Sequence, residues 1–122
     1  MNARAGTPEL EGFLPLGQAA LYILLALAGE ERHGYGIMLE AARQSRGKYK
    51  PGPGTLYDNL RKLIDQGMIE ESRRASPTED PRRRYYRITA FGRRVLAADV
   101  ERLEAVVREA KARLRPPSAR TI

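Results

Sequence analysis

The chain has 122 residues, enough for one domain with a modest core, and a second copy would add useful buried surface. Hydrophobic residues make up 42% and charged residues 30%, a balance that indicates a folded globular protein and excludes a disordered one. The sequence contains no cysteine and a single histidine, which excludes disulfides, thiolate chemistry and a multi-histidine metal site within one chain. We therefore expect a cytoplasmic protein that needs no metal or cofactor.

The formal net charge of +7 favours a polyanionic partner, which is DNA, RNA or an anionic membrane surface. Charge that only maintains solubility is the alternative, and the position of the cations along the chain decides between them. The longest apolar run, residues 19–28, has ten residues, whereas a bilayer span takes roughly 20. No basic segment closely precedes this run and no small-residue cleavage site follows it, so we expect neither a membrane partner nor a signal peptide.

The N-terminal third of the sequence predicts an arm and two helices. Residues 1–12 show little periodicity and contain glycine and proline, which predicts a flexible arm. A first helix is expected over residues 16–28. Its surface is apolar nearly all round, and this predicts burial on several sides, with Leu21 and Leu25 facing a second chain. His33 opens a second helix that runs to about Ser45.

A third helix is expected over residues 53–66, between Pro53 at its start and Gly67 at its end. Its apolar residues recur at i, i+4, i+7 and i+8, the stripe of a helix that faces a core: Leu56, Leu60, Leu63 and Ile64. The opposite face is polar and basic. A run of cations precedes the helix, at Arg43, Arg46, Lys48 and Lys50.

A hairpin and a long helix complete the chain. Residues 68–74 and 82–88 predict two strands joined by a turn at 75–81, and Thr89 is a good N-cap for the last helix. Apolar residues then follow at spacings of 4, 3, 4, 3 and 4, which predicts a coiled-coil-like dimer seam of Leu96, Val100, Leu103, Val107, Ala110 and Leu114. Packing of this helix on its own subunit is the alternative. Pro116 and Pro117 disfavour its continuation.

Three helices, a hairpin and a further helix follow one another in the order of a winged helix-turn-helix, a mainly α fold of the α+β class. We divide the chain into an arm (1–12), this domain (13–89), a dimerisation helix (90–115) and a tail (116–122). Motifs between residues 14 and 96 resemble the PadR family of transcriptional regulators, in the smaller subfamily that ends in one dimerisation helix: His33-Gly34-Tyr35-Gly36-Ile37, Pro53-Gly54-Thr55-Leu56-Tyr57, Leu60 with Leu63, Gly67-Met68-Ile69, and Tyr85-Tyr86-Arg87-Ile88-Thr89 with Gly92 and Leu96.

The resemblance implies a homodimer that binds a pseudo-palindromic operator, usually as a repressor. Some relatives release DNA when a small aromatic or cationic compound binds. The cap residue of the third helix, often Ser in the family, is Gly52 here, which is a weaker cap by about a few tenths of a kcal/mol. The chain has no tryptophan, which argues against a drug pocket built from stacked tryptophans.

With its leucine stripe turned inward, the third helix is predicted to place its polar face in the major groove. Asn59 is the candidate base reader because its amide can pair with adenine through two hydrogen bonds. Tyr57 would donate its hydroxyl to a phosphate, or else pack against the second helix. The full set of expected DNA contacts is Lys48, Lys50, Gly54, Thr55, Tyr57, Asn59, Arg61, Lys62, Arg82, Arg83 and Arg84.

Other interpretations stay open on the sequence. Each cation could be a solvated surface charge, and a winged helix could bind a protein instead of DNA. An enzyme is not expected, since no nucleophile–base pair, metal-ligand spacing or cofactor loop is present. His33 is expected to cap or support the second helix, and Gly34 with Gly36 lacks the Lys-Ser/Thr pair of a phosphate loop. The apolar first and last helices could line an effector cavity between subunits.

Overall fold

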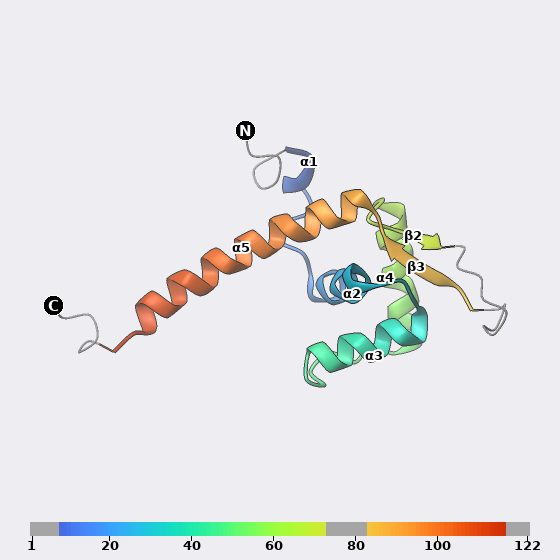
Figure 1. Cartoon of the computed structure of the whole chain (residues 1–122), viewed down its shortest axis with the longest axis horizontal. Helices are drawn as coiled ribbons and strands as arrows, with labels where there is room; N and C mark the ends of the chain where they lie inside the picture. The colour runs from blue at the N-terminus through green and yellow to red at the C-terminus, as the bar shows by residue number, and fades with distance from the viewer. Residues whose placement is uncertain (1–7, 73–82, 117–122) are drawn as a thin grey trace.

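The computed structural model describes residues 8–72 and 83–116 of the chain. In chain order this part contains α1 (Pro8–Glu11), α2 (Gln18–Gly29), β1 (Arg32–His33), α3 (Gly34–Gln44), α4 (Pro53–Asp65), β2 (Ile69–Ser72), β3 (Tyr85–Ile88) and α5 (Ala90–Leu114). Figure 1 shows α2, α3, α4 and the small sheet gathered around the first half of α5, whose second half extends away from them. The fold is the predicted winged helix-turn-helix with a long C-terminal helix. None of the helices described combines the length and apolar character needed to cross a membrane.

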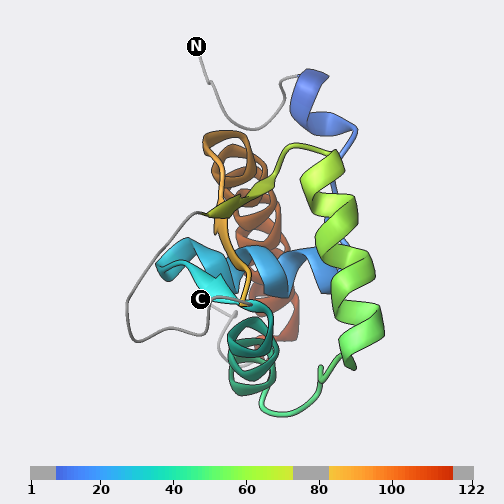
Figure 2. The same cartoon turned by 90° about the vertical axis from the view of Figure 1, so that its right-hand side faces the viewer.

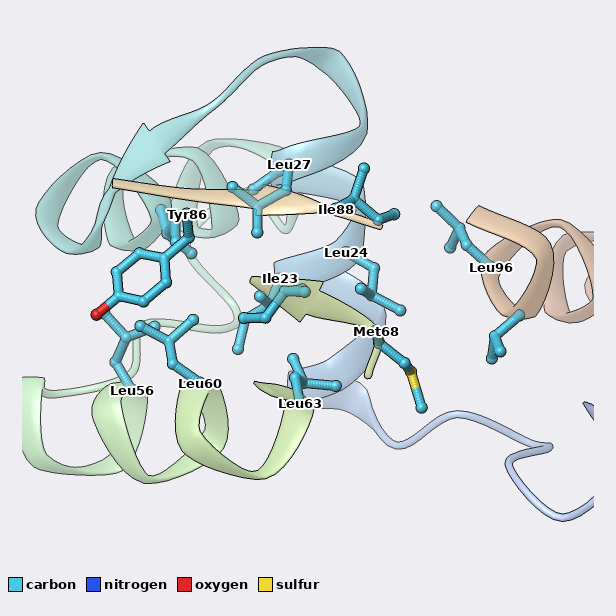
Figure 3. Close-up of a cluster of buried hydrophobic side chains, with 14 of the residues drawn as sticks. Ile23, Leu24, Leu27, Leu56, Leu60, Leu63, Met68, Tyr86, Ile88 and Leu96 are labelled. Atoms are coloured by element: carbon cyan, nitrogen blue, oxygen red, sulfur yellow. The ribbon is translucent and has the colours of Figure 1, made fainter. Parts of the chain in front are cut away.

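The leucine stripe of α4 builds the centre of the core. Leu56, Leu60 and Leu63 are 0%, 1% and 3% exposed, and Figure 3 shows them pointing from α4 toward α2 and the ring of Tyr86. Burial of a side chain of this size contributes about 1.5–3 kcal/mol each. The predicted fourth member, Ile64, is different: it is 36% exposed because it lies at the edge of the stripe.

The first long helix, α2, is buried on more than one side, as its apolar surface predicted. Ile23, Leu24 and Leu27 lie in the core, and Figure 3 shows them between α4 and β3. Leu21 and Leu25 are half-buried and pack against the same cluster from its margin. Part of the apolar surface of α2 is therefore buried within the subunit and is not available to a second chain.

The sheet has three strands in the order β1-β3-β2, all antiparallel. The β2–β3 hairpin, here called the wing, was predicted, although β2 ends at Ser72 and β3 begins at Tyr85. Residues 73–82, which include the predicted turn, lie outside the described part. The third strand, β1, was not predicted, because two residues are too few to show an alternating pattern. It places His33 opposite Tyr85.

The N-terminal segment differs from the predicted arm. Residues 8–11 form the single turn α1, and Leu10 is fully buried. Glu9 forms an ion pair with Arg94 of α5, and the Phe13 ring meets Phe91 edge to face, with 5.4 Å between ring centroids. One leucine in a short polar segment gives no periodic signal, so this docking could not be read from the sequence. Residues 1–7 lie outside the described part.

The junction of α4, β2 and α5 fixes how the long helix leaves the domain. Thr89 caps α5 as predicted, since its Oγ1 accepts a hydrogen bond from the Gly92 N–H at 3.0 Å. The same hydroxyl donates to the carbonyl oxygen of Gly67 at 2.6 Å. Gly92 packs directly on the backbone of Met68, where any Cβ would collide with the Met68 carbonyl. Glycine at this position therefore allows α5 to pass close against the start of β2.

Candidate nucleic-acid interface

The polar face of α4 is directed outward, as predicted. Thr55, Asp58, Arg61 and Lys62 are exposed, and Figure 2 shows α4 along the right-hand, outer side of the domain, with α2 and the sheet to its left. Arg61 and Lys62 form no ion pair within the part of the chain that the structure describes. The helix ends where predicted, because Gly67 has φ 78° and Met68 N–H donates to the Leu63 carbonyl at 2.9 Å. This face therefore presents two cations on a helix whose opposite side is packed into the core.

Asn59, the candidate base reader, is half-buried rather than fully outward. Its Nδ2 donates a hydrogen bond to the carbonyl oxygen of Thr55, one turn earlier on α4, at 2.8 Å. The amide keeps a second N–H and its carbonyl oxygen. A bidentate contact with adenine uses one N–H and the carbonyl oxygen, so the hydrogen bond to Thr55 leaves the donor and the acceptor that this contact needs.

Tyr57 combines the two roles that the sequence left open. Its side chain is 47% exposed. Its ring nevertheless rests on Gly34 of α3, so closely that a Cβ at position 34 would lie 2.8 Å from the ring carbon that carries the hydroxyl. Tyr57 thus packs α4 against α3 through one face and exposes the other. Gly54, at the start of α4, has open space around it.

The loop between α3 and α4 carries Lys48 and Lys50, and both side chains are exposed. The loop is held from beneath by Ser45, whose hydroxyl accepts a hydrogen bond from the Tyr49 N–H at 2.8 Å. The Tyr49 ring stacks on Tyr22 of α2 with 5.6 Å between centroids and 16° between planes. Burial raises the pKa of Tyr49. Because the side chains of Ser45 and Tyr49 hold the loop in place, its two lysines lie at a defined position beside the N-terminus of α4.

The wing supplies cations on the other side of α4. Arg84 forms an ion pair with Glu71 across the hairpin at 3.3 Å, and both side chains remain largely exposed. Arg87 pairs with Glu70 at 2.7 Å, which raises the pKa of Arg87. Arg83 is exposed, and its Nη1 lies 3.4 Å from Nε2 of His33. Arg82, the remaining predicted wing contact, lies outside the described residues.

His33 caps α3, which confirms the structural role predicted for it. Its Nδ1 accepts a hydrogen bond from the Gly36 N–H at 3.1 Å. The imidazole also meets the Tyr85 ring edge to face, with 5.4 Å between centroids. These two contacts fix the orientation of the ring, so its Nε2 points toward the wing.

A groove of about 760 Å³ runs between α4, the wing and the start of α3. Arg61 and Ile64 line it from α4, Arg83 and Arg84 from the wing, and Tyr35 from α3. Tyr35 is 61% exposed, although nothing in its sequence context distinguishes it from a core tyrosine. The groove thus joins the α4 face to the wing in one continuous surface that carries three arginines and two carboxylates.

The residues predicted for the dimer interface fall into three groups. Leu96 lies in its own subunit's core, because the first turns of α5 pack on α2 and the sheet. Three are half-buried: Leu21, Leu25 and Leu103. Four are exposed: Val100, Val107, Ala110 and Leu114. The apolar surface available to a partner therefore starts about one turn later on α5 than the heptad pattern indicates, and it also includes Val106.

Asp99 is a buried polar residue that the sequence analysis missed. It is 0% exposed on α5, and its Oδ1 accepts a hydrogen bond from Arg102 Nε at 2.7 Å. The contact raises the pKa of Arg102. Oδ2 has no hydrogen-bond partner among the described residues. An aspartate in a charged helix gives no sign of burial in the sequence, because its burial depends on the elements that pack against the helix.

The comparison with protein families decides the identity of this fold. The family model described as "Transcriptional regulator PadR-like family" matches residues 23–98 of the chain. The chain belongs to the PadR family. The matched segment begins within α2 and includes α3, α4, the wing and the buried first turns of α5. The predicted resemblance is therefore confirmed.

Two individual relatives are transcriptional regulators as well. The chain is 36% identical over 89 residues to the transcriptional regulator Rv3488 of Mycobacterium tuberculosis, an alignment that covers 73% of this chain and 78% of that protein. It is 28% identical over 108 residues to the transcriptional regulator YqjI of Escherichia coli, covering 88% of this chain and half of the relative's length.

Solved structures show the same fold. A PadR-like transcriptional regulator from Bacillus cereus has a TM-score of 0.66 and 23% identity, with 90% of this chain and 99% of that chain covered. Bacillus subtilis PadR in complex with operator DNA has a TM-score of 0.54 and 24% identity, with 64% of this chain and 44% of that chain covered. At this level of identity the two structures establish the fold alone.

Proposed function

We propose that this PadR-family regulator is a repressor that binds a pseudo-palindromic operator as a homodimer through the outward face of α4. One observation carries the proposal. The three leucines of the α4 stripe are buried in the core, which leaves an outward face with Arg61 and Lys62 between two further groups of cations. Lys48 and Lys50 lie on one side, and the wing arginines lie on the other. A helix held in this way has the layout of a major-groove reader.

The roles of the individual residues divide into positioning and reading. Cations and hydroxyls at phosphates fix the position of a protein on duplex DNA, whereas contacts with base edges provide specificity. We assign positioning to Lys48, Lys50, Lys62 and the wing, and reading to Thr55, Asn59 and Arg61. We assign Tyr57, and Gly54 at the exposed start of α4, to contacts with the sugar-phosphate backbone of the DNA. A regulator of this kind must be in the same compartment as the DNA that it binds. The proposal therefore includes a cytoplasmic location in a cell without a nucleus.

The homodimer is proposed from α5. Its second half carries exposed valines and Leu114 with no covering element in the described part of the chain. Two copies joined through this surface would present two α4 helices to one duplex, and joint binding of two half-sites raises affinity without new contacts. A small effector that binds between α2 and α5 of the two subunits would change their spacing and release the operator.

The decisive experiment is selection of bound sequences from a pool of random duplex DNA. We expect an inverted repeat whose half-site centres lie about 10 base pairs, or one helical turn, apart. Asn59→Ala should then lower the affinity for the selected site more than the affinity for random DNA. Enrichment of no sequence, with binding that is insensitive to salt, would favour the alternative in which the winged helix binds a protein.

A further inference from the structure

The apolar stripe of α5 is covered by its own subunit at one end only. Leu96 is 8% exposed because the domain packs over the stripe at this level, and Val100, about one turn later, is 37% exposed. Farther along the same side of the helix, Val107 and Leu114 are 49% and 81% exposed. Figure 1 shows no other element of the described chain beside this second half of α5. A second helix can therefore lie along the stripe from about Val100 to Leu114.

The position of the domain on α5 disfavours a parallel pair of these helices. In a parallel pair, residues with the same number lie at the same level, and the two helix axes are about 8–10 Å apart. Each domain covers its own Leu96 on the side of α5 that carries the stripe. Both domains would then lie between the two helices at the same level and overlap. In an antiparallel pair, the free end of each helix instead lies beside Val100 of the other copy, where the stripe becomes exposed.

The charges beside the stripe also distinguish the two directions. Glu104 and Lys111 are seven residues apart, which is about two turns, so both lie on the same flank of the stripe. Both are exposed, and within the described residues neither forms an ion pair. When two copies of a helix pair in opposite directions, equal flanks meet, and Glu104 of one copy lies beside Lys111 of the other. In a parallel pair these flanks lie on opposite sides of the contact, so the two charges do not meet.

Resting on the homodimer proposed above, we infer that two copies of α5 pair in opposite directions along residues 100–114, with the twofold axis beside Val107. This position places the axis midway between Glu104 and Lys111, so the pair of charges occurs twice in the dimer. An exposed ion pair adds little stability by itself, so the apolar seam holds the helices together and the charges set their direction. Neutralising one of these charges therefore leaves the dimer intact, whereas reversing it places like charges together.

This pairing also sets the distance between the two DNA-binding domains. The buried residues of α5 begin at Gly92 and end at Asp99, with Val95 near their centre. At 1.5 Å per residue, Val95 lies roughly 18 Å from an axis beside Val107, so the two domain-packed segments are roughly 36 Å apart. Half-sites one helical turn apart on DNA are separated by about 34–36 Å. In a parallel pair, the same two segments would be only about 8–10 Å apart. The antiparallel direction therefore suits the operator that the proposed function requires.

The chain has no cysteine, so one introduced thiol shows which positions meet across the dimer. In Val107→Cys the two thiols lie beside the axis, whereas in Leu114→Cys they lie toward opposite ends of the pair, roughly 20 Å apart. A thiol crosslinker that spans about 10 Å, the distance between packed helices, should convert Val107→Cys to covalent dimers on a denaturing gel. The same reagent should leave Leu114→Cys monomeric. A mixture of Leu114→Cys with Val100→Cys should give a covalent dimer that neither variant forms alone.

Each outcome bears on a different statement. Sedimentation velocity of every variant, before the crosslinker is added, establishes that it is a dimer. Crosslinking of Leu114→Cys to itself would overturn the antiparallel direction and leave the homodimer intact. A dimer in which neither Val107→Cys nor the mixture becomes crosslinked would overturn pairing through α5. An unchanged protein that is monomeric and binds no inverted repeat would overturn the proposed function as well.

A charge exchange tests the same contact without cysteine. Glu104→Lys and Lys111→Glu should each raise the dissociation constant of the dimer about 10-fold, because two pairs of like charges then meet. The double variant Glu104→Lys/Lys111→Glu should return to within about 2-fold of the unchanged protein, since opposite charges meet again. Glu109→Lys is the matched control, because Glu109 pairs at 2.7 Å with Arg113 of its own helix, away from the stripe. Sedimentation equilibrium measures all four, and a double variant as weak as the single variants would overturn the contact between Glu104 and Lys111.

Discussion

The helices α4 and α5 both carry an apolar stripe at helical spacing, but the two stripes differ in how much of each is buried within the subunit. On α4 the three leucines are almost completely buried, so the polar face is the only surface left for function. On α5 the stripe is divided. Val95 and Leu96 are buried in the core, whereas Val107 is 49% and Leu114 81% exposed. A stripe therefore predicts that a helix buries one side, but it does not tell which molecule covers it.

The length of the helix explains the difference. α4 has 13 residues and lies entirely against the rest of the domain, whereas α5 has 25 residues and extends beyond it. Figure 1 shows that nothing else in the described chain lies beside the second half of α5. At 1.5 Å per residue, the part beyond Asp99 extends roughly 20 Å, too far for the small core to cover. Its apolar residues fit a partner chain, which is why we assign this part to dimerisation.

The largest effect is expected when the exposed stripe of α5 is disrupted. Leu103→Arg combined with Val107→Glu should produce monomers, because both substitutions place charge on the proposed seam. DNA affinity should fall by about 10²- to 10⁴-fold, since the two half-sites would no longer bind jointly. Sedimentation velocity and an anisotropy titration measure the two outcomes. Glu104→Gln, at an exposed position off the seam, is the control, and a dimer that survives the double substitution would contradict the assignment.

The second-largest effect is expected on the free energy of unfolding, when the same Leu→Ala substitution is made in each of the two stripes. Leu60→Ala on α4 removes a buried side chain and should lower the free energy of unfolding by about 2–5 kcal/mol. Leu114→Ala removes the same atoms from an exposed site and should change it by less than about 0.5 kcal/mol. Urea unfolding of both, made in the monomeric double variant, excludes any contribution from the dimer. Similar losses for the two would show that the stripes are equivalent within a subunit.

A smaller effect is expected on the polar face of α4. Lys62→Gln should weaken binding to random and selected duplexes alike, because a phosphate contact carries no sequence information. The slope of log K against log salt should decrease by about 0.9 for each phosphate that the protein no longer neutralises. Mobility-shift titrations at several salt concentrations test this, with Lys111→Gln as the control. An unchanged slope would remove Lys62 from the interface.

The smallest effect concerns α3, which packs against α2 and α4. Hydrogen bonds from Arg43 and Gln44 lower the pKa of Glu40 from its usual 4.5 to about 2. Ionised Glu40 therefore stabilises the fold above about pH 4.5, and this contribution is lost as the pH falls toward 2. Compared with Glu40→Gln, the unchanged protein should be more stable at neutral pH, and the difference should shrink below pH 4.5. A melting-temperature difference that is constant across this range would contradict the prediction.

The sequence was most informative where the cause of a structure is local. Thr89 and His33 were predicted to cap α5 and α3, and both accept the hydrogen bonds of an N-cap because the donors lie three residues away. The end of α4 at Gly67 was predicted for the same reason. The docking of Leu10, by contrast, depends on surfaces provided by distant elements, and no local pattern indicates it.

The candidate interface was predicted as a set of residues but not as an arrangement. The sequence indicated that α4 and the wing carry cations. It did not show that Arg84 is paired with Glu71, that Asn59 bonds back to its own helix, or that Arg83 meets the ring of His33. Each of these contacts, except the one within α4, joins residues from different elements. Their distances follow from the packing of the sheet against the helices.

By itself, the sequence determined the order of the four long helices and the wing, the inward face of α4, the family and the excess of positive charge. These depend on periodicity, caps and composition, which are properties of neighbouring residues. Only the tertiary structure decided where the apolar stripe of α5 leaves the core, and which side chains meet beside the wing. Both depend on how far one element reaches past another, and that distance is set by the packing of the whole domain.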